Sequence, residues 1–240
     1  MGKKEAERLL TVEKLTSGYG KVTVVRNVDI HVGQGEIVSI IGRNGVGKST
    51  FVKTLIGLNR ATSGVIHFKG VNISAMKSHD RARSGIGYVP QGHGIFPKLT
   101  VEENLKMGRD INKSSPNLDF GVVYDYFPRL RERRLQRAGT LSGGEQAMLA
   151  ISRALVGRPE LLLLDEPSEG IQPSIIVHIS DILKRINRET GLTVLFVEQH
   201  IGLIQQLSGR CYAMDKGSIV GELTEGDIAD YDSIKQYLAV

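Results

Sequence analysis

Residues 42–50, Gly-Arg-Asn-Gly-Val-Gly-Lys-Ser-Thr, join an apolar run to a segment of helical pattern. The run before them, IVSII at 37–41, predicts a strand. The segment STFVKTLIGL, at 49–58, predicts a helix that stops near Gly57. Glycine adopts the positive φ angles that a sharp connection needs, so the glycines of 42–50 suit a turn between the two elements. This stretch therefore predicts the strand–turn–helix unit of an α/β fold.

Outward from this unit, apolar runs alternate with helical patterns. Residues 9–41 contain three predicted strands broken by glycines, which indicates an antiparallel N-terminal part. The runs LLLLD at 161–165 and TVLFVE at 193–198 are almost wholly apolar, as expected of parallel strands buried on both faces. Residues 98–156 are mainly helical in pattern. We therefore expect an α/β fold with a central, mostly parallel sheet, an antiparallel N-terminal sheet and a helical insert.

Two pairs of residues predict where helices begin in the insert. Thr100 lies three residues before Glu103, and Ser142 lies three residues before Glu145. In such a capping box the hydroxyl and the carboxylate satisfy N–H groups of the first helical turn. The polar stretch DINKSSP, at 110–116, is the best candidate for a surface loop.

The composition indicates an ordinary globular chain. It has 240 residues, of which 40% are hydrophobic and 24% charged, and this excludes a disordered chain, a collagen-like repeat and a coiled-coil rod. The formal net charge of +5 points only weakly to an anionic partner. The single cysteine, Cys211, excludes an internal disulfide framework and a zinc site made of thiolates. We expect Cys211 to be a small buried side chain in a strand.

The chain shows no targeting or membrane-spanning segment. Its first residues, MGKKEAERLL, are charged and lack the apolar region of a signal peptide. No stretch approaches the roughly 18 uninterrupted apolar residues of a membrane helix. We therefore expect a cytosolic protein, with any membrane role reached through a partner.

The spacing of Gly42, Gly47, Lys48 and Ser49 satisfies the pattern G-x-x-x-x-G-K-[ST], the P-loop. Its glycines let successive backbone N–H groups point at phosphate oxygens, and the helix that follows adds the positive end of its dipole. We expect Lys48 to reach the β- and γ-phosphates and the Ser49 hydroxyl to bind Mg²⁺.

Two carboxylates follow the apolar run 161–164. Asp165 ends the predicted buried strand, where it can hold Mg²⁺ through water, and Glu166 can polarise an attacking water. By itself, an Asp-Glu pair is common where a buried strand ends and the chain reaches the surface. Together with the P-loop it predicts a site that hydrolyses a nucleotide.

The string LSGGEQ, at 141–146, decides among families of such proteins. With GRNGVGKST and LLLLDEP it resembles the nucleotide-binding subunits of ATP-binding-cassette (ABC) transporters, over essentially the whole chain from about residue 9. We call 141–146 the signature stretch. The resemblance implies a single ABC-type P-loop domain over 1–240, with a core lobe at about 9–91 and 156–240 and a helical subdomain at about 92–155.

The resemblance also implies how such a chain acts. Two cassettes, alike or different, enclose two ATP molecules, and attached membrane permease subunits change state as the pair closes and reopens. Ser142, Gly143 and Gly144 of one subunit would contact the γ-phosphate held by the other. The expected location is cytoplasmic, peripheral on the inner face of the cell membrane. The loop residues expected to bind nucleotide are Gly42, Arg43, Asn44, Gly45, Val46, Gly47, Lys48, Ser49 and Thr50.

Two further positions carry over from the family pattern. Tyr19, in SGYG, matches the aromatic residue that stacks on adenine. Gln91, in YVPQG, matches the glutamine that touches Mg²⁺ and the attacking water and links to the membrane subunit. The implied ligands of Mg²⁺ are therefore Ser49, Gln91 and Asp165.

The chain departs from the family pattern at two places. The family usually has a histidine in a V-T-H-D pattern after the next strand, whereas residues 197–200 are Val-Glu-Gln-His. We assign contact with the γ-phosphate to Gln199, which can donate a hydrogen bond, and keep His200 as a substitute if the loop shifts. Gln172 replaces the aspartate of the usual S-x-G-L-D loop, so the contact made there across the dimer must differ.

These departures resemble one subfamily, the ATPases of importers for branched-chain amino acids, urea and short-chain amides. The shared phrases are VEQ at 197–199, IFPKLTVEENL at 95–105 and FPRLRERR at 127–134. The phrases SEGIQPSI at 168–175 and YVPQG at 88–92 favour the urea and amide branch over the amino-acid branch. A solute-binding protein outside the membrane would then be an indirect partner.

Other classes of protein fit the residues less well. Repair ATPases of this fold carry long insertions and translation ATPases carry two fused cassettes, and a nucleic-acid partner would need basic clusters beyond 129–137. A GTP-binding switch lacks its N-K-x-D motif here. Lys48, Asp165 and Glu166 are all present, which argues against a regulatory cassette without activity.

Overall fold

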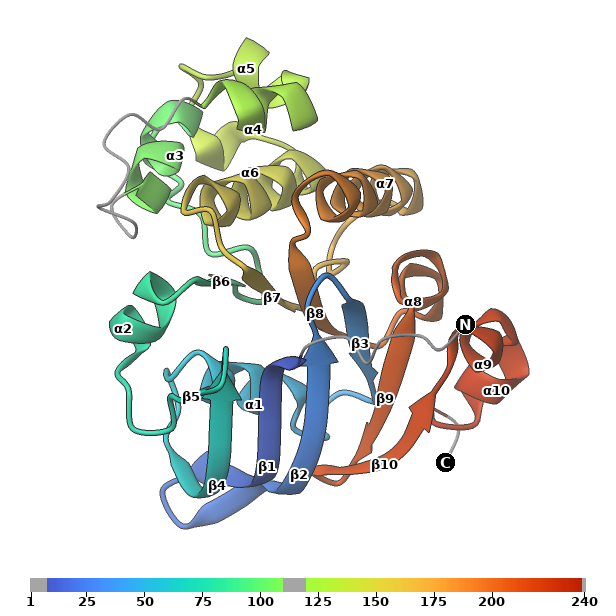
Figure 1. Ribbon diagram of the computed structural model, residues 1–240. Coiled ribbons are helices and arrows are strands. Elements are labelled where there is room, and N and C mark those ends of the chain that lie inside the picture. Colours follow the sequence, from blue (N-terminus) through green and yellow to red (C-terminus); the bar gives the residue numbers. More distant parts are fainter. Residues whose placement is uncertain (1–7, 110–119, 239–240) are drawn as a thin grey trace.

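Two β-sheets organise the part of the chain that the computed structural model describes, residues 8–109 and 120–238 (Figure 1). One sheet is antiparallel, with the order β2-β1-β4-β5. Its strands are β1 (Arg8–Tyr19), β2 (Val22–Gly33), β4 (Ala61–Phe68) and β5 (Val71–Asn72). The expected antiparallel N-terminal sheet is confirmed.

The second sheet lies at the centre of the fold and has the order β10-β9-β3-β8-β7-β6. All its neighbouring strands are parallel except the edge hairpin of β9 and β10. Its strands are β3 (Ile37–Ile41), β6 (Ile86–Val89), β7 (Leu161–Asp165), β8 (Thr193–Glu198), β9 (Arg210–Asp215) and β10 (Ser218–Leu223). The predicted mostly parallel sheet is confirmed, and β3 belongs to it rather than to the N-terminal sheet. Cys211 is buried in β9, as expected.

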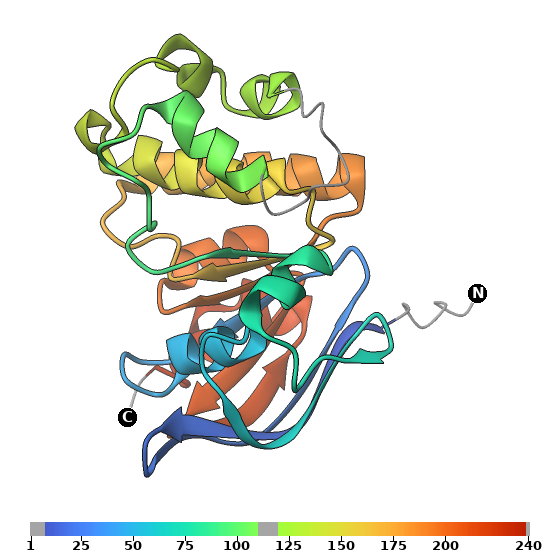
Figure 2. The ribbon, with the colours of Figure 1, turned by 90° about the vertical axis from the view of Figure 1, so that its left-hand side faces the viewer.

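Helices cover the central sheet and gather at one end of the molecule. In Figures 1 and 2, α3 to α6 lie together at the end remote from the antiparallel sheet, with α7 beside α6. The described helices are α1 (Lys48–Leu55), α2 (Ser78–Arg83), α3 (Val101–Arg109), α4 (Gly121–Tyr126), α5 (Pro128–Glu132), α6 (Gly143–Val156), α7 (Pro173–Thr190), α8 (Ile201–Leu207), α9 (Glu225–Ala229) and α10 (Tyr231–Lys235), with a 3₁₀ turn at Ala138–Thr140. The exact division into lobes stays a prediction.

The core is built on both faces of the central sheet because successive strand residues point to opposite sides. In β7, Leu161 and Leu163 pack toward α1 and the antiparallel sheet, whereas Leu162 and Leu164 pack toward α6 and α7. All four are fully buried. Each such leucine contributes about 1.5–3 kcal/mol through burial, so β7 is a firm platform for the Asp165 that ends it.

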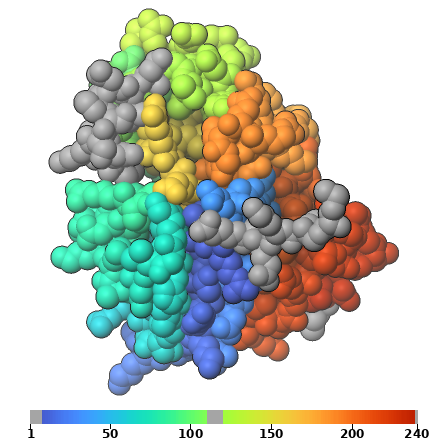
Figure 3. Space-filling view, in the orientation of Figure 1, coloured from blue at the N-terminus to red at the C-terminus, as the bar shows by residue number. Residues whose placement is uncertain are grey.

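The two sheets meet beside the β9–β10 hairpin. The Arg26 N–H of β2 donates a 2.7 Å hydrogen bond to the carbonyl oxygen of Gly217, in the hairpin turn. In the space-filling view, β1 and β2 (blue) lie between β4 (cyan) on one side and the C-terminal strands (red) on the other (Figure 3). Strands from the first and the last parts of the described chain thus pack side by side.

Several local expectations can be compared with the structure. Both predicted capping boxes are confirmed. β9 and β10 form a hairpin, and α7 ends at Gly191, which has a left-handed conformation. The short helices α2, α8 and α9 were not expected, because they are too short for a clear helical period. The stretch 110–116 lies outside the described residues. Among the described helices, none has the length and apolar character needed to cross a bilayer.

Candidate functional site

The P-loop connects β3 to α1 as the sequence predicts. Gly47 has φ 112°, a left-handed conformation that suits glycine, and a Cβ there would lie 3.3 Å from Val24. The first-turn N–H groups of α1 have no acceptors within their own helix, and the positive end of the helix dipole lies with them. This glycine-lined turn is therefore shaped to accept an anionic group.

Lys48 is buried beneath this loop and makes three polar contacts with its Nζ. It donates to the carbonyl oxygens of Gly42 at 2.8 Å and Arg43 at 3.0 Å. It also lies 3.1 Å from Oε1 of Glu166, and the two side chains are only 2% and 9% exposed. The loop lysine and the second carboxylate, far apart in sequence, thus form one ion pair.

Ser49 and Asp165 also meet. The Ser49 hydroxyl donates a 2.7 Å hydrogen bond to Oδ1 of Asp165, and the Tyr88 hydroxyl lies 3.4 Å from Oδ2. Burial raises the pKa of Asp165, and the hydrogen bond from Ser49 offsets only part of that rise. A hydroxyl beside a carboxylate is the hard-oxygen pair that Mg²⁺ prefers, so these two residues fit that ion.

Glu166 is held in an unusual backbone conformation directly after β7. Its φ is 49°, and its N–H donates a 3.0 Å hydrogen bond to the carbonyl oxygen of Val197. A non-glycine residue in this region costs of order 1–3 kcal/mol, and such residues cluster at functional sites. The Gln91 amide, which follows β6, donates to Oε2 of Glu166 at 3.3 Å. Gln91 is thereby brought to the predicted base.

A cavity of about 650 Å³ opens beside Glu166. Gln199 and His200 both line it, together with Arg43 and Asn44 of the P-loop. Arg43 also donates a 2.7 Å hydrogen bond from Nε to the carbonyl oxygen of Leu238, which lines the same cavity. Both candidates for the γ-phosphate contact therefore lie on the same side as the P-loop and Glu166.

The two candidates differ in what their side chains do. Nδ1 of His200 accepts a 3.2 Å hydrogen bond from the Leu203 N–H, so His200 caps the N-terminus of α8. This bond occupies one of the two ring nitrogens in helix capping. Gln199 precedes the cap and carries no such structural bond among the described contacts, which favours it for the γ-phosphate contact.

Tyr19 ends β1 and lies beside Thr50, the last residue of the P-loop. Tyr19 is 53% exposed, and the Thr50 hydroxyl lies 3.5 Å from its phenol oxygen. An exposed aromatic face beside the phosphate-binding turn is available to stack on a flat ring. The contact of Tyr19 with adenine stays a prediction.

The signature stretch lies elsewhere, at the start of α6. Ser142 caps this helix in a box with Glu145, whose Oε1 pairs with Arg133 Nε at 3.0 Å. A Cβ on Gly144 would lie 2.6 Å from Ile175 Cγ2, so only glycine lets α6 approach α7 this closely. Ser142, Gly143 and Gly144 do not line the cavity beside Glu166. The signature stretch instead borders the loop after Glu166, since a Cβ on Gly143 would lie 3.2 Å from the carbonyl oxygen of Gly170.

Two contacts of the site were not foreseen. Tyr88 reaches Asp165 from β6, and burial together with the Asp165 charge raises the pKa of Tyr88, which keeps it a hydrogen-bond donor. Glu198 is buried at the end of β8 and bonds to loops on both sides of the cavity. The sequence alone gives little sign of these two contacts, because Tyr88 and Glu198 each have a partner that is distant in sequence.

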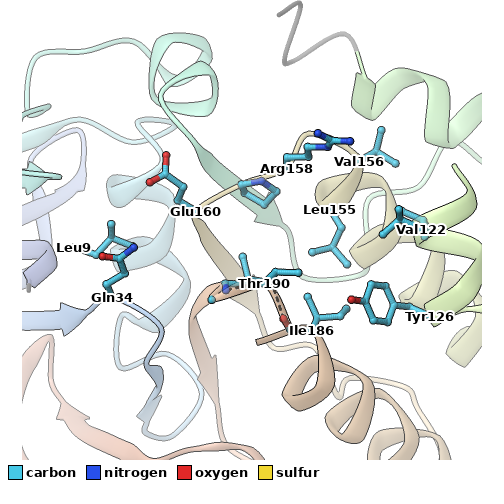
Figure 4. A pocket seen from close by; sticks show the side chains of 14 residues that line it. Leu9, Gln34, Val122, Tyr126, Leu155, Val156, Arg158, Glu160, Ile186 and Thr190 are labelled. Carbon is cyan, nitrogen blue, oxygen red and sulfur yellow. Dashed lines mark hydrogen bonds between the residues drawn. The ribbon is translucent and has the colours of Figure 1, made fainter. Parts of the chain in front are cut away.

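An apolar cavity of about 460 Å³ lies on another part of the molecule (Figure 4). Leu155 and Ile186 of α6 and α7, with Val122 of α4, form its apolar wall, and Arg158 and Glu160 lie at its edge. None of the predicted site residues lines it. It is therefore separate from the cluster of Lys48, Ser49, Gln91, Asp165 and Glu166.

Comparisons with known proteins show the family of this chain. The family model described as ABC transporter matches residues 25–169. The chain is 46% identical to the high-affinity branched-chain amino acid transport ATP-binding protein BraG of Pseudomonas aeruginosa, over 88% of this chain and 91% of that protein. It is 33% identical to the probable branched-chain amino acid transport ATP-binding protein LivF of Archaeoglobus fulgidus, over 95% and 97%.

The fold is also found in a solved structure. The crystal structure of an ATP-binding cassette of an ABC transporter in its ADP conformation superposes with a TM-score of 0.84, over 98% of this chain and 100% of that one, at 24% identity. This likeness confirms the α/β cassette fold. The family match and the two relatives span most of the chain, and they carry the assignment of activity. The chain therefore belongs to the ABC transporter family and is one of its ATP-hydrolysing, ATP-binding subunits.

Proposed function

We propose that this chain is the ATPase subunit of an importer for branched-chain amino acids. The observation that carries the proposal is the 46% identity to BraG over 88% of the chain, joined by the likeness to LivF. Both relatives are named as ATP-binding proteins of branched-chain amino acid transport. Their alignments include the P-loop, both carboxylates and the signature stretch within nearly the full length of the chain.

This proposal replaces the first choice made from the motifs. The phrases at 168–175 and 88–92 favoured urea or a short-chain amide as the solute. The relatives above support the amino-acid alternative instead. The earlier choice rested on a few loop residues that touch nucleotide or partner subunits and never the solute, so those residues constrain the solute only indirectly.

The site fits MgATP, and its own residues have distinct tasks. The loop 42–50 would hold the phosphates, with Lys48 at the γ-phosphate, while Tyr19 stacks on the base. Ser49, Asp165 and Gln91 would hold Mg²⁺, which neutralises phosphate charge when bound. Glu166 would orient the attacking water from its rigid position after β7, and Gln199 would donate to the γ-phosphate. The Ser49–Asp165 distance of 2.7 Å and the Lys48–Glu166 distance of 3.1 Å support this arrangement.

The absence of Ser142, Gly143 and Gly144 from the lining of the cavity beside Glu166 supports a pair of cassettes. Ser142, Gly143 and Gly144 would complete the ATP site of a second ATPase subunit, identical or different. The helical segment at about 92–155 would dock on the permease subunits at the cytoplasmic face of the membrane. A solute-binding protein would deliver the amino acid to the permease, and no nucleic acid takes part.

Binding by the associated solute-binding protein tests the solute. The tagged full chain would be purified from its own membrane with its permease, and the solute-binding protein that docks on this complex would be identified. That protein should bind leucine, isoleucine or valine in calorimetry, and reconstituted vesicles should take up labelled leucine when ATP is supplied.

Urea and acetamide serve as the competing ligands in the same assays. Binding and ATP-driven uptake of urea or acetamide without leucine would overturn the amino-acid proposal and restore the first choice. The complex reconstituted with the Glu166→Gln chain is the control, since its uptake of any solute should stop.

A further inference from the structure

The buried carboxylate of Glu198 is the most heavily bonded side chain beside the candidate site. Glu198 ends β8 and is only 1% exposed. Among the described residues, it accepts four hydrogen bonds, three from backbone N–H groups and one from a hydroxyl. It takes part in neither the predicted phosphate contacts nor the predicted metal contacts. Burying a carboxylate is costly unless it is fully hydrogen-bonded, so this arrangement calls for a role.

Its two oxygens serve two different loops. Oε1 accepts the N–H groups of Gln199 at 2.8 Å and His200 at 3.1 Å. Oε2 accepts the Ser168 hydroxyl at 2.7 Å and the Ser168 N–H at 3.3 Å. We call residues 168–170 the first loop and residues 199–200 the second loop. One side chain therefore ties together loops that follow β7 and β8.

Both loops border the reaction site. The first loop begins two residues after Glu166, and both loops line the cavity beside it. The first loop also reaches the signature helix, because a Cβ on Gly143 would lie 3.2 Å from the carbonyl oxygen of Gly170. Glu198 thus stands between the predicted γ-phosphate contact, Gln199, and the start of α6.

We propose that Glu198 is a positioning residue for ATP hydrolysis, which holds the first and second loops in one fixed arrangement so that Glu166 and Gln199 face the γ-phosphate together. The proposal rests on the roles given to Glu166 and Gln199 under the proposed function. Glu198 itself contacts neither nucleotide nor water in this scheme. It acts on catalysis by fixing where the second loop begins and where the first loop runs.

The chemistry of the contacts makes the carboxylate specific. Every group that faces Glu198 in these four bonds is a donor, and an ionised carboxylate is an acceptor only. A glutamine of the same shape would turn an NH₂ group toward one of the two loops, where it meets N–H or O–H donors. That loop would lose its anchor while the backbone of β8 stays paired on both sides.

The Glu198→Gln variant of the full chain tests this. Steady-state hydrolysis of MgATP should show kcat lowered about 10- to 100-fold, since small displacements of catalytic groups have effects of this size. The KM for ATP and the affinity for a fluorescent ATP analogue should change less than about twofold, because the P-loop and Tyr19 are untouched. A purely structural defect would lower kcat, the affinity for ATP and the unfolding temperature together.

Two further variants make the result specific. Glu36→Gln is the control, since Glu36 also accepts a backbone N–H, from Gly33 at 2.8 Å, and pairs with Arg210 at 2.7 Å. It precedes β3, however, at the end of the parallel strands opposite to Glu198. Glu36→Gln should leave kcat unchanged. Ser168→Ala removes one donor with little risk to folding and should lower kcat to a smaller extent. The double variant Ser168→Ala/Glu198→Gln should lose no more than Glu198→Gln alone, because both act through one link.

Each outcome decides for or against the proposal. An unchanged kcat in Glu198→Gln, a parallel loss of ATP affinity, or multiplying losses in the double variant would overturn it. The Glu166→Gln variant, measured in parallel, tests the underlying assignment separately. If Glu166→Gln keeps its turnover, the proposed base is wrong, whatever Glu198→Gln does.

Discussion

Lys48 and Glu166 form a buried ion pair, with Nζ 3.1 Å from Oε1. The lysine comes from the P-loop and the carboxylate from the residue after β7, so the pair joins the phosphate-binding turn to the predicted catalytic base. Both charges lie almost out of contact with solvent, where electrostatic interactions are stronger than at the surface. The same pair places the base beside the group expected to hold the γ-phosphate.

The first prediction follows from this pair. Glu166→Gln keeps the shape of the side chain but removes its charge and its ability to take a proton from water. Its NH₂ group cannot accept the contact that one of the two carboxylate oxygens makes with Lys48 or Gln91. We expect kcat for ATP hydrolysis to fall by about 100- to 10,000-fold, the usual contribution of a general base. ATP binding should persist, and light scattering should detect a dimer that forms with ATP and does not dissociate.

The surface pair of Lys69 and Glu160 supplies the control. Its ions lie 2.6 Å apart, but the side chains are 44% and 49% exposed. Glu160→Gln should therefore leave both turnover and ATP binding unchanged, as expected of exposed ion pairs. Normal hydrolysis by Glu166→Gln would contradict the assignment of the base.

Much of the fold could be predicted because its signals are local. The four leucines of β7 and the run 193–198 are apolar enough to mark buried parallel strands, and the spacing of 42–50 marks the turn between β3 and α1. Capping residues such as Ser142 marked helix starts with their partners only three residues away. Each of these features depends on neighbours in sequence.

The remaining features depend on contacts between distant segments. No local pattern shows that Glu198 bonds to Ser168, or that Tyr88 reaches Asp165. The pairing of β3 with β8 rather than with β2 is likewise set by the sheet as a whole. The solute could not be read from the motifs for a further reason, since the motif residues recognise phosphate and magnesium, which all such ATPases share.

A second prediction concerns the trade between stability and function at Asp165. Burial raises the pKa of this carboxyl, which means that the fold disfavours its charged form. Asp165→Asn keeps an oxygen for the Ser49 hydroxyl and removes the charge. We expect a higher unfolding temperature at pH 7 in the absence of nucleotide, together with loss of Mg²⁺-dependent hydrolysis by about 100-fold or more.

The pH dependence gives this prediction its sign. Since the folded-state pKa lies above the unfolded value, the folded protein binds more protons between the two, and stability falls as pH rises through that window. The advantage of Asp165→Asn should therefore be full above the folded-state pKa and shrink as pH falls toward the unfolded value. Urea unfolding of both proteins across this range measures it. An advantage that grows toward acid would contradict the raised pKa.

A third prediction tests the aromatic ring at the end of β1. Tyr19→Ala should weaken ATP binding by roughly 10-fold, because stacking of an aromatic ring on a base contributes about 1–3 kcal/mol. Tyr19→Phe keeps the ring and should bind almost normally, since the contact with Thr50 is long at 3.5 Å. Tyr231, which is equally exposed at 53%, is the matched control, and Tyr231→Ala should have no effect. Equal binding by Tyr19→Ala and wild type would remove Tyr19 from the site.

The last prediction separates Gln199 from His200. His200 caps α8 through Nδ1, so His200→Ala should lower the free energy of unfolding by about 1 kcal/mol and change turnover little. Gln199→Ala should leave stability unchanged and lower kcat about tenfold or more, as expected when a donor to transition-state charge is removed. Thermal unfolding and ATP hydrolysis measured on both variants distinguish the two roles. A larger loss of turnover in His200→Ala would show that the second loop shifts when nucleotide binds and that the histidine contacts the γ-phosphate.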